Sequence, residues 1–585
     1  FLASKEQFHA YLRAGGQPSS GDQEEKEEED GESREDAGVE KEPTERKRAR
    51  GQNKSRPCMK PNHYEQSRLC PSVTQGCAEK CYFGARCRFL HDVGEYMAVK
   101  PADLGHSCVL FETFGKCIYG VTCRFAQAHL GDGYQNIVNT DLAKQWEGKS
   151  LVRNSLSKDL QHQLRKRKFS FKKADEYLRG LAKPHGDGGK GCKATGPDVL
   201  QSPGPTGGED ASSIKTVGPV TDEDVIKLRS CEKKKLEIQG KLYLAPLTTC
   251  GNLPFRRICK RFGADVTCGE MAVCTNLLQG QSSEWALLKR HHTEDVFGVQ
   301  LEGAFPDTMT KCAELLNQTI EVDFVDINVG CPIDLVYKKG GGCALMTRSN
   351  KFEQIIRGMN SVLDVPLTVK IRTGVQEKIN LAHKIIPKIR EWGASMVTLH
   401  GRSREQRYTR GADWDYIAEC AKIASPMPLF GNGDILSYED ANRAMQMGVS
   451  GIMIARGALI KPWLFTEIKE QRHWDISSSE RFDILKDFTR YGLEHWGSDT
   501  QGVEKTRKFL LEWLSFLCRY IPVGLLEHLP QKINERPPYY MGRDYLETLM
   551  ASQNVDDWIK ISELLLGPVP TTFTFLPKHK ANSYR

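Results

Sequence analysis

Short apolar runs alternate with amphipathic helical patterns through the second half of the chain. The runs begin at Tyr243, Asp265, Phe297, Phe324, Leu367, Met396, Pro428 and Gly451. Runs this short, each followed by a helical pattern, are typical of parallel strands joined by crossover helices. Eight such units predict an α/β fold with a (β/α)8 TIM barrel over residues 235–475. An open doubly wound sheet is the alternative fold.

From about Ser478 the pattern becomes helical, and no further strand-like run follows. Apolar residues recur at helical spacing in residues 482–496, 503–520 and 556–566. We therefore predict a separate C-terminal helical domain over residues 476–570, followed by a tail over residues 571–585.

The start of the chain has little apolar content. The segment up to about Glu45 is rich in glutamate and almost without aromatic or branched residues, so burial cannot offset the entropy cost of ordering it. Seven Lys and Arg with no acidic residue follow between Arg46 and Lys60. Such a run is used as a nuclear signal or an RNA-contacting arm, and a merely solvated basic stretch is an equal alternative. These features predict a disordered tail over residues 1–68, first acidic and then basic.

Two further segments precede the barrel. Residues 132–182 carry a basic helical pattern that includes the run LRKRKFSFKK. Residues 183–220 are rich in Gly, Pro and Ser, which predicts a flexible linker between the two halves of the chain.

The overall charge hides this uneven distribution. The chain has 585 residues, with 82 Lys and Arg against 75 Asp and Glu. The window from Asp22 to Glu45 holds 13 acidic and 3 basic residues, so the net charge of +7 leaves about +17 for the remainder. A basic body behind an acidic tail favours a polyanionic partner.

The sequence also limits the class of protein. No stretch approaches the roughly 18 consecutive apolar residues that a membrane-spanning helix needs, so no membrane association is expected. The chain begins without Met, and no signal-peptide pattern follows. The 19 cysteines are therefore expected to be reduced thiols and metal ligands of a cytoplasmic or nuclear protein.

Most of the clustered cysteines lie between residues 69 and 131, in two sets of three cysteines and one histidine. The first set is Cys70, Cys81, Cys87 and His91, and the second is Cys108, Cys117, Cys123 and His129. Three thiolates and one imidazole form a closed tetrahedral set for structural Zn2+, which a segment without a core needs in order to fold. Cys77 could compete with Cys70 as a ligand.

The two segments resemble CCCH zinc fingers, many of which bind RNA. The second finger has Gln127 where the usual spacing places its histidine, and His129 follows two residues later. Aromatic and basic residues interleave in both fingers: Phe83, Phe89, Phe114, Tyr119 and Phe125 alternate with Arg86, Arg88, Lys116 and Arg124. Aromatic rings can stack on unpaired bases while Arg neutralises phosphate, although some of these rings are expected simply to pack each finger.

Chemistry in a (β/α)8 barrel lies where the strands end. The fourth run ends in the sequence from Asn328 to Pro332, which includes Cys331, and is followed by a Gly-rich loop. A cysteine in this place is suited to proton donation or to nucleophilic attack. The next two runs end with Lys370 and Arg372, and with His400 and Arg402, so four polar groups point toward the barrel mouth.

The last two runs end in small residues that can hold a phosphate. Gly431, Asn432, Gly433 and Asp434 follow the seventh run, and Ala455, Arg456 and Gly457 follow the eighth. Small residues leave backbone N–H groups accessible near a helix N-terminus, and Arg456 adds positive charge.

Six ordered motifs resemble the tRNA-dihydrouridine synthases: APLTTCGNLPFR, INVGCP, VKIRTG, TLHGR, GNGDI and MIARGALIKPWLF. The tandem fingers and linker resemble the eukaryotic branch of that family that acts on uridine 47 in the variable loop of tRNA. The resemblance implies FMN-dependent reduction of the C5=C6 bond of uridine, with NADPH (or NADH) recharging the flavin. It makes tRNA the expected partner and mRNA a second candidate partner. No obligate protein partner is inferred.

The resemblance also implies roles for individual residues. Cys331 protonates C5 of the uridine, and Asn328, Arg372 and Arg402 lie at the substrate. Pro246, Leu247 and Thr248 line the isoalloxazine ring, Gln300 bonds its pyrimidine edge, and Lys370 places positive charge near flavin N1. His400 helps to bind FMN, while Asn432, Gly433, Asp434, Ala455 and Arg456 bind the ribityl chain and phosphate. The C-terminal helical domain is implied to bind tRNA.

Two other functions fit parts of the sequence. A flavoprotein that reduces a free pyrimidine would share the barrel, but it would not need fingers that bind nucleic acid. A zinc-finger RNA-binding protein with an inactive barrel would not need Cys331, Lys370 and the phosphate site.

Overall fold

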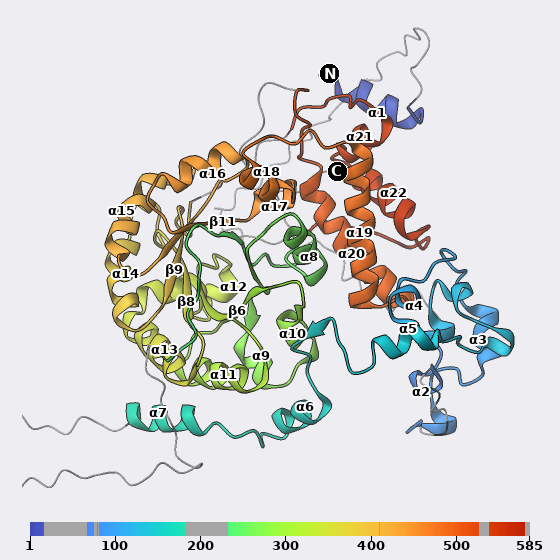
Figure 1. Cartoon of the computed structure of the whole chain (residues 1–585), viewed down its shortest axis with the longest axis horizontal. Helices are drawn as coiled ribbons and strands as arrows, with labels where there is room; N and C mark the ends of the chain where they lie inside the picture. Colours follow the sequence, from blue (N-terminus) through green and yellow to red (C-terminus); the bar gives the residue numbers. More distant parts are fainter. Residues whose placement is uncertain are drawn as a thin grey trace, which may run out of the picture.

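The computed structural model describes residues 1–16, 67–74, 76, 79, 81–182, 232–406, 408, 410–525 and 537–578. The predicted basic run, the predicted linker over residues 183–220 and Cys77 lie outside these residues. Figure 1 shows a barrel on the left, a helical domain beside it and the finger region at the lower right.

Eight parallel strands close into the barrel. They are β2 (Leu242–Leu244), β3 (Val266–Cys268), β6 (Val296–Glu302), β7 (Phe324–Val329), β8 (Leu367–Arg372), β9 (Met396–His400), β10 (Leu429–Asn432) and β11 (Gly451–Ile454). Their order is β3-β2-β11-β10-β9-β8-β7-β6, and the pairing of β3 with β6 closes the ring. Each predicted apolar run coincides with one strand. The predicted TIM barrel is confirmed, and the open doubly wound sheet is excluded.

Aromatic side chains fill the base of the barrel, at the N-terminal ends of the strands. Tyr243, Phe324 and Phe430 point inward from three strands and are at most 1% exposed. The ring centroid of Tyr243 lies 5.9 Å from that of Phe324 and 6.1 Å from that of Phe430. We call these three rings the aromatic plug. On β7 and β10 the next inward positions, two residues apart along each strand, are polar: Asp326 and Asn328, and Asn432.

Helices follow the strands and cover the outside of the barrel (Figure 1). The principal ones are α8 (Leu253–Arg261), α11 (Pro306–Thr319), α13 (Ser349–Val362), α14 (Ala382–Glu391), α15 (Trp414–Ala424), α16 (Tyr438–Met445), α17 (Arg456–Ile460) and α18 (Leu464–Glu470). Each buries an apolar stripe, as α11 does with Met309, Cys312 and Leu316. Within the described residues no helix is long and apolar enough to span a membrane.

The C-terminal domain consists of α19 (Ser478–Trp496), α20 (Thr500–Leu517), α21 (Tyr545–Met550) and α22 (Val555–Leu566). Asp499 caps α20 by accepting a hydrogen bond from the N–H of Gly502 at 2.9 Å. Trp513 of α20 packs between Phe255 of α8 and Phe488 of α19, with ring centroids 5.3 and 5.1 Å away. The helical domain is therefore joined to the barrel by a continuous apolar core.

The first residues of the chain form a helix rather than a disordered tail. Helix α1 (Lys5–Arg13) begins with a capping box between Ser4 and Gln7. Phe8 and Leu12 lie one turn apart, are 1% and 4% exposed, and face α21 of the C-terminal domain. The prediction of disorder is wrong for residues 1–16, because this apolar stripe finds a partner surface at the other end of the chain. Residues 17–66 lie outside the described part.

Residues 132–182 lead from the second finger to the outside of the barrel (Figure 1). They form α5 (Thr140–Gln145), β1 (Val152–Arg153), α6 (Lys158–Arg165) and α7 (Lys172–Ala182). Helix α7 packs on α11 and α13, and Glu314 of α11 accepts hydrogen bonds from the N–H groups of Lys173 and Ala174 at 3.2 and 2.8 Å. The predicted helical segment therefore also contains a strand; α5 packs on α4 of the second finger, and α6 and α7 pack on the barrel.

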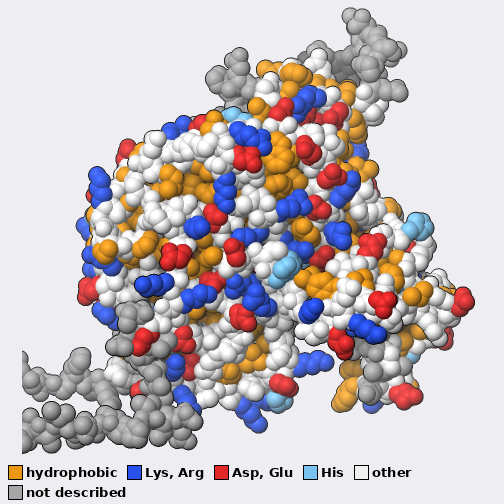
Figure 2. All heavy atoms as spheres, in the orientation of Figure 1, with side chains coloured by type: hydrophobic (Ala, Val, Ile, Leu, Met, Phe, Trp, Pro, Cys, Tyr) orange, Lys and Arg blue, Asp and Glu red, His pale blue; other side chains and the backbone are white. Residues whose placement is uncertain are grey.

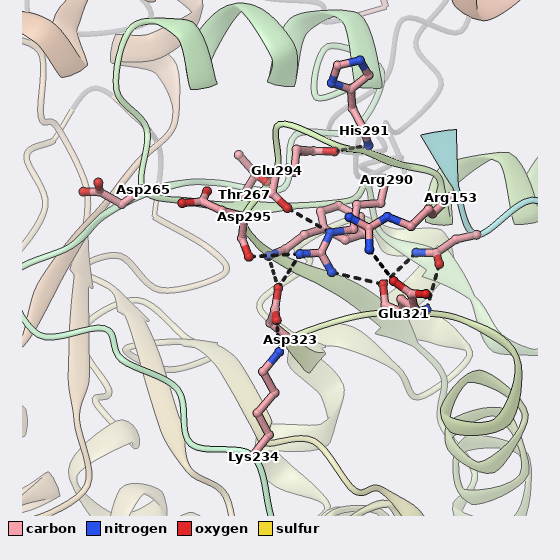
Figure 3. A network of polar contacts seen from close by, with 12 residues as sticks. Arg153, Lys234, Asp265, Thr267, Arg290, His291, Glu294, Asp295, Glu321 and Asp323 are labelled. Carbon is pink, nitrogen blue, oxygen red and sulfur yellow. Dashed lines mark hydrogen bonds and ion pairs between the residues drawn. The ribbon is translucent and has the colours of Figure 1, made fainter. Parts of the chain in front are cut away.

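Strand pairing and one ion pair fix this segment to the base of the barrel, beside a network of further polar contacts (Figure 3). Strand β1 pairs with β5 (Arg290–His291) in the antiparallel direction. The guanidinium of Arg290 donates to the carboxylate of Asp323 at 2.8 Å, and Lys234 pairs with the same carboxylate. Arg153 of β1 pairs with Glu321. The connection between the fingers and the barrel is thus held by hydrogen bonds and by charge.

The molecular surface mixes both signs of charge. Figure 2 shows Lys and Arg side chains interspersed with Asp and Glu over the viewed face. The excess of Lys and Arg that composition predicts outside the acidic segment is therefore not gathered into one positive patch on this face.

Candidate active site and metal centres

A cavity of about 350 Å3 lies at the C-terminal ends of the barrel strands. Predicted site residues that line it are Pro246, Leu247, Thr248, Gln300, Asn328, Cys331, Lys370, Arg372, His400, Asn432, Gly433, Asp434, Ala455 and Arg456. The remaining one, Arg402, does not line the cavity. Its guanidinium lies behind the wall and donates to Asp434 at 2.5 Å and to the carbonyl of Arg410 at 2.7 Å.

Cys331 is held at the cavity wall just beyond the end of β7. The Oδ1 atom of Asn328 accepts hydrogen bonds from the N–H groups of Cys331 at 2.9 Å and Gly330 at 3.3 Å. Burial raises the pKa of the Cys331 thiol above its ordinary value. A protonated thiol can donate a proton, whereas nucleophilic attack requires the thiolate. Of the two roles that the sequence leaves open, the structure favours proton donation.

A chain of hydrogen bonds continues from Asn328 into the barrel. The amide of Asn328 donates to Oε1 of Gln300 at 2.8 Å, and the amide of Gln300 donates to Asp326 at 2.8 Å. Thr368 donates to the other carboxylate oxygen of Asp326 at 2.6 Å. Burial raises the pKa of Asp326 to about 6. These bonds fix the side-chain amide orientation of Gln300, with its carbonyl oxygen facing Asn328.

Cationic groups gather on the neighbouring strands. Burial, together with the charge of Arg372, lowers the pKa of Lys370 to about 8. No hydrogen bond is made by the Lys370 ammonium among the described residues. Burial, reinforced by Arg372 and Lys370, holds the pKa of His400 well below its ordinary value, so its imidazole is neutral. A half-buried ammonium on the cavity wall, without a hydrogen-bonded partner, suits an anionic or electron-rich ligand.

Glycine residues shape the corner of the cavity just beyond the ends of β10 and β11. Gly433 has a φ of +141°, and a Cβ atom added there would lie 2.5 Å from Cβ of Ala412. A Cβ atom on Gly457 would lie 2.2 Å from the carbonyl oxygen of Ile435. Asp434 joins this corner to Arg456 through an ion pair of 2.6 Å. The corner therefore presents compact backbone and an oriented guanidinium, which fits a phosphate.

Two residues that the sequence did not indicate also line the cavity. The Tyr408 hydroxyl accepts a hydrogen bond of 3.4 Å from Arg372, and its ring stacks on His400 with centroids 6.3 Å apart. Although burial opposes ionisation, Arg372 lowers the pKa of Tyr408 to about 8. Lys578, in the segment predicted to be a tail, donates to the hydroxyl of Thr249 at 2.9 Å. Neither residue lies at the end of a barrel strand, so a search of the strand ends could not find them.

The two predicted metal sets are each brought together. Within each set, one ligand atom per residue lies within 4.8 Å of the others. Sulfur atoms are 3.7 Å apart for Cys70 and Cys81 and 3.8 Å apart for Cys108 and Cys123. Tetrahedral Zn2+ with Zn–S bonds of about 2.3 Å requires sulfur atoms about 3.8 Å apart. Cys70 occupies the position for which Cys77 was the alternative.

The histidines complete both sets. The Nε2 atoms of His91 and His129 are buried and have no hydrogen-bond partner among the described residues, as expected of nitrogens aimed at a metal. The Nδ1 atom of His129 lies 2.8 Å from Oδ1 of Asn136, which fixes the orientation of the ring. The unusual spacing of the second finger therefore still brings His129, and not Gln127, to the three cysteines. The donor sets and their spacing fit Zn2+.

Comparison with known proteins agrees with this architecture. The dihydrouridine synthase (Dus) family matches residues 243–514, and the DUS3L CCCH zinc finger domain matches residues 66–99 and 100–132. A tRNA-dihydrouridine(47) synthase [NAD(P)(+)]-like protein of Xenopus tropicalis is 75% identical over 541 residues, covering 92% of this chain and 84% of the relative. The chain belongs to the dihydrouridine synthase family.

Similarly named relatives of this dihydrouridine synthase occur in distant organisms. The Homo sapiens relative is 67% identical over 620 residues, covering 100% of this chain and 95% of the relative. The Arabidopsis thaliana relative is 45% identical over 615 residues, covering 91% and 88%. The predicted family and the tandem zinc fingers are confirmed, while the roles of single residues in this dihydrouridine synthase stay predictions.

Proposed function

We propose that this chain reduces the C5=C6 bond of a uridine in tRNA to 5,6-dihydrouridine, using FMN and NADPH (or NADH). The observation that carries the proposal is the cavity wall itself. A protonated thiol, Cys331, and a half-buried ammonium, Lys370, line one cavity that ends in a glycine-rich corner with Arg456.

The residues present fit FMN. Arg456 and the backbone around Gly433 would hold its phosphate, while Pro246 and Leu247 supply an apolar surface for the ring system. Lys370 would lie toward the pyrimidine end, where positive charge stabilises the reduced flavin. When bound and reduced, FMN supplies the hydride.

The chain's own residues supply the proton and orient the thiol that donates it. Cys331 donates its Sγ proton to C5 of the uridine, and the loop that carries Cys331 is oriented by Asn328. Arg372 donates to the carbonyl of Gly330 at 2.7 Å, which fixes the residue before the thiol. The neutral imidazole of His400 and the Asn328–Gln300 pair offer uncharged polar groups beside a pyrimidine.

The target uridine must leave its stack to enter the cavity, so the protein has to bind the surrounding RNA. By its resemblance we place the target at position 47, in the variable loop of tRNA, and we keep mRNA as a second substrate. The fingers weigh against a free pyrimidine as substrate. The intact set of Cys331, Lys370 and Arg456 weighs against an inactive barrel.

Purification of the full chain tests the proposal directly. The protein should be yellow, and its oxidation of NADPH should be faster with tRNA that lacks dihydrouridine than without RNA. Dihydrouridine in the recovered tRNA would be detected by mass spectrometry. A colourless preparation, or an equal stimulation by free uracil, would contradict the proposal.

A further inference from the structure

The second zinc set has a neighbour from the opposite end of the chain. Ser498 lies in the loop between α19 and α20 and is 2% exposed. Its Oγ atom lies 3.1 Å from Sγ of Cys123 and 3.5 Å from Sγ of Cys117. The N–H of Arg124 donates to the carbonyl of Ser498 at 2.8 Å. A hydroxyl at these distances can donate to metal-bound thiolates, which are acceptors once deprotonated.

The contact around Ser498 is tightly fitted. Gly497 has a φ of +111°, and a Cβ atom added there would lie 2.3 Å from the Tyr119 hydroxyl. The side chain of Tyr119 in the second finger therefore packs against the helical domain.

Apolar residues extend the same contact. The cluster contains Leu104, Val109 and Phe125 from the second finger and Leu493, Val503, Leu565 and Leu566 from the helical domain. A Cβ atom on Gly567 would lie 2.6 Å from Leu104, so the surfaces touch closely there as well. Phe125 and Tyr119 were candidates for stacking on RNA bases, and here both pack against protein.

The first finger presents the equivalent turn to solvent. Tyr82 and Phe83 follow Cys81 as Ile118 and Tyr119 follow Cys117. Tyr82 is 94% and Phe83 is 63% exposed, with ring centroids 5.3 Å apart and planes 88° apart.

Positive charge accompanies the exposed rings. Arg86 and Arg88 lie a few residues further on and are exposed. Exposed aromatic rings beside arginines match the way proteins bind unpaired nucleotides.

We infer that the two fingers have different roles. The second finger is a structural joint whose zinc-bound thiolates accept a hydrogen bond from Ser498 of the helical domain. The first finger is the one that binds RNA, through Tyr82 and Phe83. This division of roles rests on the proposed function, because it assumes that the protein's ligand is RNA.

The joint is tested by zinc release from the full-length protein. Ser498→Ala removes the hydroxyl and leaves a small side chain, so transfer of one of the two zinc ions to a chromophoric chelator should become about tenfold faster. Amide hydrogen exchange should rise at the start of α20. Ser479→Ala, at an exposed serine of α19, is the control and should leave both readouts unchanged. Unaltered zinc release in Ser498→Ala would overturn the structural role.

The RNA role of the first finger is tested by direct binding of a tRNA transcript without dihydrouridine. Replacing both Tyr82 and Phe83 with Ala should weaken binding at least about tenfold, because stacking on two bases is lost. The matched variant Ile118→Ala alters the equivalent exposed position of the second finger and should bind normally. Both variants should retain both zinc ions.

The possible failures are distinguishable. If the unaltered protein binds no tRNA, the proposed function fails. If it binds tRNA and the variant with Tyr82→Ala and Phe83→Ala binds equally well, only the division of roles fails. Equal losses in that variant and in Ile118→Ala would show that both fingers contact RNA, which also overturns the division.

Discussion

The backbone N–H of Cys331 donates a hydrogen bond of 2.9 Å to Oδ1 of Asn328. This bond turns the chain back on itself directly after β7 and places the thiol on the cavity wall. The amide of Asn328 is in turn bound to Gln300, so the position of the thiol is linked to the barrel interior.

Cys331→Ala should abolish dihydrouridine formation while leaving flavin and tRNA binding intact. The substitution removes the proton donor and creates only a small space at a residue that is 8% exposed. Single-turnover reactions with prereduced protein, followed by mass spectrometry of the tRNA, measure the effect. Product formation at the unaltered rate would remove Cys331 from the role of acid.

Flavin affinity of the flavin-free protein should fall as the pH rises through about 8, the pKa of Lys370. That pKa is lowered from 10.5, so the ammonium is charged below about pH 8 and neutral above it. A neutral amine no longer attracts the electron-rich pyrimidine end of the flavin, beside which Lys370 is proposed to lie. FMN titrations monitored by fluorescence should show this step in the unaltered protein.

The corresponding variant isolates the cause. Lys370→Met carries no charge at any pH, so its FMN affinity should already be low at pH 7 and should show no step near pH 8. A step of the same size in Lys370→Met would assign it to another group.

Tyr408 should ionise near pH 8 in the flavin-free protein, well before an ordinary tyrosine. Arg372 stabilises the phenolate, and this effect exceeds the opposing effect of burial. Ultraviolet difference spectra should show about one tyrosinate near this pH, and Tyr408→Phe should lack it. Tyr520 and Tyr540 should not contribute to this absorbance change, because burial raises the pKa of each far above this range.

Gly433→Val should yield protein with little bound flavin. The backbone there has a φ of +141°, and even a Cβ atom would clash with Ala412 at 2.5 Å. The ratio of flavin to protein absorbance after purification measures the loss, and circular dichroism shows whether the fold persists. Gly411→Val is the control, since no heavy atom lies within 4 Å of an added Cβ there. Full flavin content in Gly433→Val would separate this corner from the cofactor.

The barrel and the residues at its mouth could be predicted, because both depend on the local pattern of apolar and polar positions along the chain. Each apolar run became a strand, and parallel strands in a closed ring bring their final residues to one place. Cys331, Lys370 and His400 are far apart in sequence, yet each lies in or just beyond the last residues of a strand, so a single rule finds all three.

Other features depend on contacts between distant segments. Lys578 reaches the cavity only because the last described residues fold back over the barrel, and no local pattern signals that path. Tyr408 lies in a connecting segment beyond β9, where the pattern does not fix side-chain direction. Arg402 ends up behind Asp434, because the chain turns immediately after His400.

One missed element did carry a local signal. Ser4 and Gln7 have the spacing of a capping box, and Phe8 and Leu12 form a short apolar stripe one turn apart. The acidic window that follows dominated the composition of the region and concealed them. A short amphipathic helix is stable only with a partner surface, and α21 supplies one.

The aromatic plug has a kinetic consequence. Tyr243, Phe324 and Phe430 seal the far end of the barrel, so ligands must reach the active-site cavity from the C-terminal ends of the strands. On the proposed function, the nicotinamide and the uridine need the same entrance. They must therefore take turns, and the enzyme would store reducing equivalents between two visits, as in a ping-pong cycle.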